Sequence, residues 1–109
     1  METTNSDGIV TVAMVPRFDA YTAKEVETFL QGEVSSGTEQ IICDFSHTDY
    51  ISSAGLRVLL AVAKALKKKG GSIALCALKP PVREVFEIAG FTSLFPIYSD
   101  EKEARTKMK

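Results

Sequence analysis

The sequence has few of the residues on which catalysis and metal binding usually depend. It contains one histidine, His47, two cysteines and no tryptophan. No group of His, Cys, Asp and Glu residues has the spacing of metal ligands, so we expect neither a metal nor another cofactor. The nucleotide-binding pattern G-x-x-x-x-G-K-[ST] and the hydrolase pattern G-x-S-x-G are both absent. These absences favour a protein that is acted upon over an enzyme.

An excess of charge of one sign is also missing. Lys and Arg together number 13 and Asp and Glu 14, which gives a net charge of −1. A surface that binds nucleic acid directly normally shows a clear basic excess. The apolar runs are far shorter than the roughly 20 residues of a membrane-spanning helix, and residues 1–5 lack the features of a signal peptide. We therefore expect a cytoplasmic protein with no direct contact to nucleic acid or membrane.

The length and the hydrophobic content fit one folded unit. The chain has 109 residues, of which 45% are hydrophobic, so residues 1–109 are predicted to form a single domain around one core. Cys43 and Cys76 each lie in an apolar, strand-like run, where a cysteine usually acts as a small buried hydrophobic residue. We expect both to be structural thiols.

The most informative stretch is residues 41–66. A short apolar run closed by Asp44 is typical of a buried strand, and a polar loop follows it. Ser52 and Ser53 then lead into apolar residues spaced by three and four as far as Leu66, which predicts a helix with one buried face. A pair of serines is therefore expected where a strand has passed through a loop into a helix.

This helix start is predicted to be open to a ligand or a modifying group. No Glu or Gln stands three residues after either serine to complete a capping box, and Gly55 removes bulk from the first turn. The first N–H groups of a helix have no internal partner and carry the positive end of its dipole, so they attract anions. A plain serine N-cap is the alternative interpretation.

The flanking sequence alternates between strand and helix patterns. Strands are expected at residues 9–15, 73–78 and 94–98, the last one short and near an edge, and helices at residues 22–34, with a Thr22–Glu25 capping box, and 80–89. Residues 17–19 are expected to be a loop. Strands joined through helices should run parallel, so the Ser52–Ser53 loop should lie at the carboxyl edge of an α/β sheet.

Several short sequence motifs occur together along the chain. They are DFS at residues 44–46, YISSAGLRVLL at 50–60, and shorter matches at 17–19, 22–23, 81–86 and 90–95. Over residues 8–98 they resemble the STAS domain family, and more narrowly its bacterial anti-sigma factor antagonists. The resemblance implies an α/β fold with a mixed four- to five-stranded sheet and three to four helices packed against it. Residues 99–109 are expected to be a charged tail with at best a weak helix.

The resemblance also implies partner switching. In that family the unmodified protein binds an anti-sigma factor that is itself a serine kinase, and phosphorylation releases it; a metal-dependent serine phosphatase resets the switch. The family's phosphorylated position corresponds to Ser53 here. Ser52, where many relatives carry an acidic residue, is the alternative acceptor, and Ala54 stands where many have Ser or Thr. The residues expected to shape the partner-binding surface are Asp19, Ser52, Ser53, Ala54, Gly55 and Leu56.

Two other functions remain open at this point. STAS-like domains also serve as non-phosphorylated scaffold subunits in transport or signalling assemblies, where the serines would be helix caps. An enzymatic alternative would use Ser53 as a nucleophile with His47 as its base.

Overall fold

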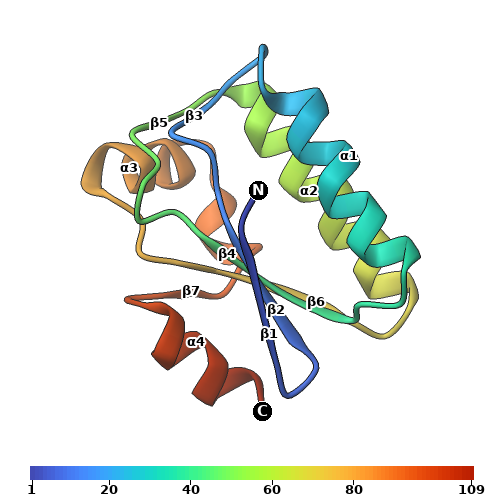
Figure 1. Cartoon of the computed structure of the whole chain (residues 1–109). Coiled ribbons are helices and arrows are strands. Elements are labelled where there is room, and N and C mark those ends of the chain that lie inside the picture. The colour runs from blue at the N-terminus through green and yellow to red at the C-terminus, as the bar shows by residue number, and fades with distance from the viewer.

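The computed structural model describes residues 1–109 and contains a five-stranded mixed sheet with four α-helices (Figure 1). The strands, in their order across the sheet, are β1 (Thr3–Ser6), β2 (Ile9–Ala13), β4 (Gln40–Asp44), β6 (Ser72–Cys76) and β7 (Ile97–Tyr98). β1 pairs antiparallel with β2, and every other pair in this sheet is parallel. The predicted α/β fold and its parallel strands are confirmed.

The helices cover the two faces of the sheet unequally. α1 (Ala23–Ser35), α2 (Ser53–Lys68) and α3 (Pro80–Ile88) contribute to a cluster of 21 buried apolar residues, whereas α4 (Glu101–Met108) packs on the other face over a cluster of four. β4 serves both clusters because its side chains alternate: Ile41 and Cys43 face α1–α3, and Ile42 faces α4. No helix is long and apolar enough to cross a membrane.

Residues 17–19 and the loop after β4 hold more regular structure than the sequence predicts. β3 (Arg17–Phe18) pairs in parallel with β5 (Tyr50–Ile51) to form a separate two-stranded sheet. Both strands are only two residues long, too short for an alternating pattern to reveal them. This small sheet places the turn after Phe18 beside the start of α2.

The C-terminal segment also differs from the prediction. The expected strand at residues 94–98 is reduced to β7 at the edge of the sheet, preceded by a short 3₁₀ helix (Phe91–Ser93). Residues 101–108 are a true helix, α4, capped by the Asp100 carboxylate, which accepts a hydrogen bond from the Glu103 N–H at 2.8 Å. The expectation of at best a weak helix in this charged tail understated α4, because the stability of the helix comes from tertiary contacts rather than from amphipathic spacing.

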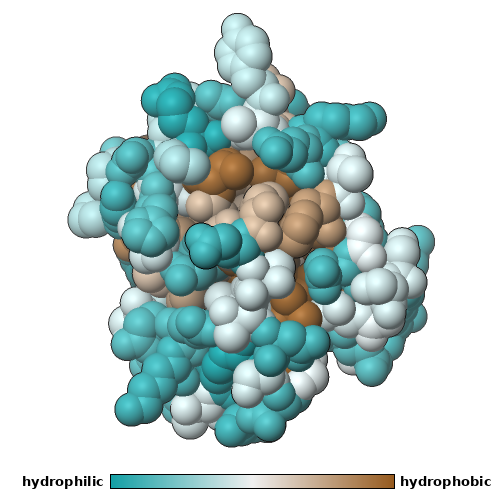
Figure 2. Space-filling view, viewed as in Figure 1, coloured by the Kyte–Doolittle hydropathy of each residue, from teal (hydrophilic) through white to brown (hydrophobic).

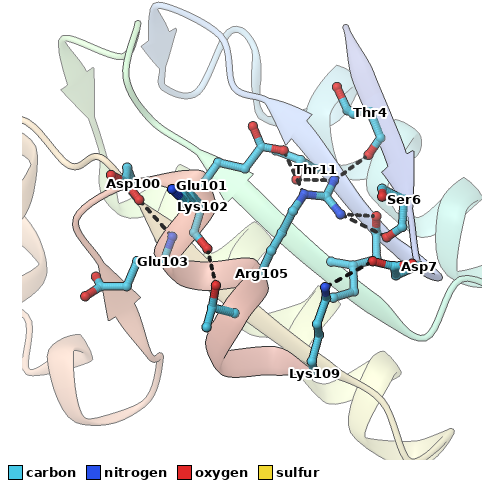
Figure 3. A network of polar contacts seen from close by, with 12 residues as sticks. Thr4, Ser6, Asp7, Thr11, Asp100, Glu101, Lys102, Glu103, Arg105 and Lys109 are labelled. Carbon is cyan, nitrogen blue, oxygen red and sulfur yellow. Dashed lines mark hydrogen bonds and ion pairs between the residues drawn. The ribbon is translucent and has the colours of Figure 1, made fainter.

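Arg105 supplies most of the polar contacts that hold α4 to the sheet (Figure 3). Its guanidinium donates to the carbonyl oxygens of Thr4, Ser6 and Ile9 and to the Thr11 hydroxyl at 2.9–3.1 Å, and its Nε pairs with Glu101 at 3.0 Å. Hydrogen bonds with Thr11 and then with Arg105 hold the pKa of the Glu101 carboxyl below its usual range. The β1–β2 hairpin and the C-terminal helix are thereby fastened to each other.

One further local prediction needs correction. The Thr22–Glu25 capping box does not form, because Thr22 has helical backbone angles and its side chain makes no cap bond; its hydroxyl instead donates to the Arg17 carbonyl at 2.7 Å. Cys43 and Cys76 are both buried, as expected, but they lie in different apolar clusters on opposite faces of the sheet. Burial raises the pKa of the Cys76 thiol to about 12.

We predict that Arg105→Lys lowers the free energy of unfolding by about 1–3 kcal/mol, because an ammonium group cannot reproduce the fork of donors and leaves partly buried carbonyls without partners. Urea unfolding measures the change. Arg83→Lys is the matched control, since Arg83 makes only a 3.9 Å ion pair with Glu87 on an exposed helix face, worth at most about 0.5 kcal/mol. Equal effects of the two substitutions would contradict the fastening role of Arg105.

Candidate functional site at the start of α2

The loop between β4 and β5 is held in place by backbone and side-chain hydrogen bonds. The Thr48 hydroxyl, which is buried, donates to the Val15 carbonyl at 2.7 Å, and the Asp49 N–H donates to the Pro16 carbonyl at 2.8 Å. The Asp44 carboxylate accepts from the Ser46 N–H at 2.9 Å. Residues 44–49 therefore reach the start of α2 in a fixed conformation, alongside the segment that follows β2.

Gly55 lets the first turn of α2 approach β3 closely. A Cβ atom at Gly55 would lie 2.9 Å from the Phe18 carbonyl oxygen, 2.9 Å from Ile51 Cγ1 and 3.0 Å from Phe18 Cγ. The same Phe18 carbonyl accepts a hydrogen bond from the Ser52 N–H at 2.9 Å. The absence of a side chain at Gly55 thus brings the turn after β3 against the start of α2.

The two serines at this start have different environments. Ser52 is the N-cap residue, with extended backbone angles, but its side chain makes no cap bond, and its hydroxyl oxygen is buried without a hydrogen-bond partner. Ser53, the first helical residue, is exposed. The interpretation of the pair as plain serine caps was therefore wrong. Ser53 is therefore exposed at the surface, whereas the Ser52 hydroxyl is buried and makes no hydrogen bond.

The first turn of α2 has the features of an anion-attracting helix end. Its first intrahelical hydrogen bond runs from the Leu56 N–H to the Ser52 carbonyl at 3.1 Å, and no side chain caps the turn. No acidic residue lies in this turn, whereas Lys67 and Lys68 lie in the last turn. The positive end of the dipole of this 16-residue helix is therefore not neutralised by an acidic residue of its own first turn.

Asp19 organises the turn that faces this helix start. Its Oδ1 accepts hydrogen bonds from the Tyr21 N–H at 3.0 Å and the Thr22 N–H at 3.3 Å, and its Oδ2 lies 3.5 Å from Arg17 Nε. Arg17 also lies over the Tyr50 ring, 4.6 Å from the ring centroid. The Asp19 side chain thus fixes the conformation of the turn before α1, although it bonds no N–H of the helix itself.

The six residues expected to shape a partner-binding surface differ in exposure. Ser53 is exposed, and Asp19, Ser52 and Ala54 are partly exposed. Gly55 and Leu56 are buried, and Leu56 belongs to the main apolar cluster. These last two shape the surface by positioning the helix rather than by presenting side chains. Ala54 lines a shallow hollow of about 390 Å³ between α1 and α2, together with Ala23, Glu27, Arg57, Val58 and Ala61.

Asp49 and His47, in the loop between β4 and β5, are both exposed, and only Asp49 forms an ion pair. Asp49 forms a 2.6 Å ion pair with Lys79, and the hydrogen bond from Lys79 lowers the pKa of the Asp49 carboxyl. His47 is exposed and makes no side-chain hydrogen bond. No three His, Cys, Asp or Glu side chains converge as metal ligands would.

Two aromatic residues near the site were missed by the sequence analysis. Tyr21 and Tyr50 are among the four large hydrophobic residues that remain exposed, at 95% and 41%. Each lies in or beside a turn rather than on a periodic apolar face, so no pattern called attention to it. The available signal was a large aromatic side chain next to a polar loop residue: Tyr21 precedes Thr22, and Tyr50 follows Asp49.

Comparisons with known proteins agree with one another. The sequence model described as the STAS domain matches residues 1–104. The chain is 42% identical over 103 residues to BtrV of Bordetella bronchiseptica, named as a proposed anti-sigma factor antagonist, covering 94% of this chain and 89% of BtrV. A proposed anti-sigma factor antagonist from Thermotoga maritima has a similar structure, with a TM-score of 0.92 at 21% identity, covering 98% of this chain and 92% of that one. The phosphorylated form of the Bacillus cell fate determinant SpoIIAA gives a TM-score of 0.77 at 18% identity, covering 99% and 98%.

We predict that Gly55→Ala destabilises the protein by about 1–3 kcal/mol, because the new methyl group would overlap the Phe18 carbonyl and Ile51. Gly32→Ala is the matched control, since Gly32 lies in α1 with open space where its Cβ would be. There the substitution should stabilise the helix by up to about 1 kcal/mol. Thermal unfolding of both variants measures the difference, and a stabilising effect at both positions would contradict the close approach at Gly55.

Ser52→Ala should leave the free energy of unfolding unchanged or raise it by up to about 1 kcal/mol. Loss of an N-cap serine ordinarily costs about 0.5–2 kcal/mol, but the Ser52 hydroxyl makes no cap bond, and its burial without a partner is itself unfavourable. Urea unfolding of Ser52→Ala beside the wild type checks the sign. A loss of more than about 1 kcal/mol would mean that the hydroxyl caps α2 in solution.

Proposed function

The chain belongs to the STAS domain family, and we propose that it is an anti-sigma factor antagonist in a partner-switching pathway that regulates sigma-factor-dependent transcription. Residues 1–109 act as one STAS domain. The unmodified domain binds an anti-sigma factor that is also a serine kinase, and phosphorylation of Ser53 releases it. The proposal is supported by the 42% identity to BtrV over nearly the whole chain and by the geometry of the α2 start.

The observation that carries the proposal is the exposed Ser53 hydroxyl at an uncapped helix start. A kinase must bring ATP to the acceptor oxygen, and only Ser53 of the two serines offers that access, because the Ser52 hydroxyl is buried. Ser53 Oγ attacks the γ-phosphorus of ATP, the bond to ADP breaks, and the hydroxyl proton passes to a base of the kinase. The domain supplies the acceptor and no catalytic group, so Ser53 is favoured over Ser52 as the modified residue.

A phosphate at this position should affect the complex far more than the domain. It adds about −1.5 to −2 charges, which an unneutralised helix N-terminus stabilises by about 0.3–1 kcal/mol, or up to about 2 kcal/mol if partly buried. Within a complementary interface the same charge meets groups arranged for a neutral hydroxyl, and such a mismatch costs several kcal/mol. Since about 1.4 kcal/mol corresponds to a tenfold change in affinity, binding falls a hundredfold or more.

The proposed pathway assigns one further partner and a location. A metal-dependent serine phosphatase removes the phosphate and restores the binding form; the metal belongs to the phosphatase, and the domain itself needs no cofactor. Asp19, Ser52, Ala54, Gly55 and Leu56 set the shape of the surface around Ser53. The domain acts in the cytoplasm without contacting DNA or membrane directly.

The test uses recombinant anti-sigma factors of the kinase type from the host genome, with binding measured by calorimetry. Wild type and Ser53→Ala should bind one of them with similar affinity, and Ser53→Asp should bind it at least a hundredfold more weakly. Ser72→Asp is the matched control, because Ser72 is exposed at the opposite end of the sheet, at the start of β6, and it should bind like the wild type.

Phosphorylation is followed on the same samples by incubation with ATP and intact mass measurement. The wild type should gain one phosphate that peptide mapping places on Ser53, and Ser53→Ala should gain none. Wild-type affinity in Ser53→Asp would contradict electrostatic release. A phosphate mapped to Ser52 would mean that the buried hydroxyl becomes accessible during the reaction.

A further inference from the structure

Tyr21 is the most exposed large hydrophobic residue of the chain. Its relative exposure is 95%, compared with 80% for Ile88, 55% for Leu94 and 41% for Tyr50. An aromatic ring left in water stabilises the free domain hardly at all, whereas tyrosine is among the residues that most often dominate the affinity of a protein interface. We propose that Tyr21 is the anchor by which this domain holds the anti-sigma factor, an inference that rests on the proposed function.

The turn that carries Tyr21 is already ordered in the free domain. The Asp19 carboxylate accepts from the Tyr21 N–H and the Thr22 N–H, and the Thr22 hydroxyl accepts from the Asp19 N–H at 3.0 Å. α1 begins directly after this turn. Because the turn is already ordered, little backbone entropy is lost on binding. The entropic cost therefore offsets little of the favourable free energy that the ring contact contributes.

The position of Tyr21 places it within reach of a partner that covers Ser53. The Ser52 N–H bonds to the Phe18 carbonyl, and three residues of chain keep Tyr21 within about 11 Å of Phe18. A standard interface covers about 800 Å² on each partner, a patch about 30 Å across. A kinase that brings ATP to Ser53 therefore lies over the Asp19 turn, and its contact surface is continuous with Tyr21.

An apolar hollow beside Tyr21 defines what the partner should present. The hollow has a volume of about 530 Å³ and is lined by Met1, Tyr21, Lys24, Glu25, Thr28 and Phe29 along α1. Figure 2 shows hydrophobic surface gathered on this side of the molecule, around the N-terminus and next to α1. The geometry fits an apolar side chain of the anti-sigma factor that packs against the Tyr21 ring, with polar groups of the partner facing Lys24 and Glu25 at its rim.

The experiment measures the affinity of the anti-sigma factor that binds the unmodified wild type. Tyr21→Ala should weaken binding thirtyfold or more with an unchanged melting temperature, because the ring contacts little of its own domain. Ile88→Ala is the matched control: it removes a similarly exposed apolar side chain from α3 and should change affinity less than twofold. Tyr21→Phe should retain most of the affinity if the ring, rather than the hydroxyl, makes the contact.

A second pair of variants tests the hollow without touching the core. Thr28→Arg places a long side chain in the hollow from an exposed position on α1 and should weaken binding at least tenfold. Thr106→Arg makes the same change on α4, on the opposite face of the sheet, and should have no effect. If Tyr21→Ala or Thr28→Arg binds within twofold of the wild type, the anchor proposal is overturned while the Ser53 switch stands. If the wild type binds no kinase-type anti-sigma factor, the proposed function fails and the anchor fails with it.

Discussion

The close contact between Gly55 and Phe18 is the constraint on which the rest of the site depends. Because Gly55 has no side chain, the first turn of α2 lies directly against the backbone of β3, and the Phe18 carbonyl is free to accept the Ser52 N–H. This contact fixes where α2 begins. At this helix start the Ser52 hydroxyl oxygen is buried and residue Ser53 is exposed.

The contact joins two parts of the chain with different roles. On one side, the Asp19 turn is held by its own carboxylate and carries Tyr21; on the other, α2 presents an open helix start. Neither part needs to move for a phosphate to be accepted at Ser53, because that residue lies at the surface while the buried apolar cluster lies beneath it. The proposed modification would therefore change the charge of this surface while its shape stays the same, so that one partner is rejected without unfolding of the domain.

Much of the fold was predictable from residue patterns, whereas the smallest and most polar features were not. The apolar run before Asp44 and the three–four spacing after Ser53 gave β4 and α2 correctly, because a strand buried on both faces is apolar throughout and a helix buried on one face repeats its apolar residues every three or four positions. The two-residue strands β3 and β5 are too short to have a period. α4 was expected to be weak at best, because the Arg105 side chain that does most to hold it is bonded to carbonyls about a hundred residues earlier in the chain. Such a contact depends on the tertiary fold and leaves no local trace in the sequence.

At the candidate site the sequence located the surface but not its inner arrangement. It placed Ser52 and Ser53 at a helix start and Asp19 nearby, yet it could not tell the buried hydroxyl from the exposed one, since both are serines at adjacent positions. The most direct test of the account is the thermal unfolding of a domain that carries phosphoserine at position 53, introduced during translation so that no kinase is needed. The account predicts a melting temperature equal to or above that of the unmodified domain. A clear decrease would show that the phosphate disturbs the architecture beneath it, and would contradict the claim that the modification acts on the partner complex alone.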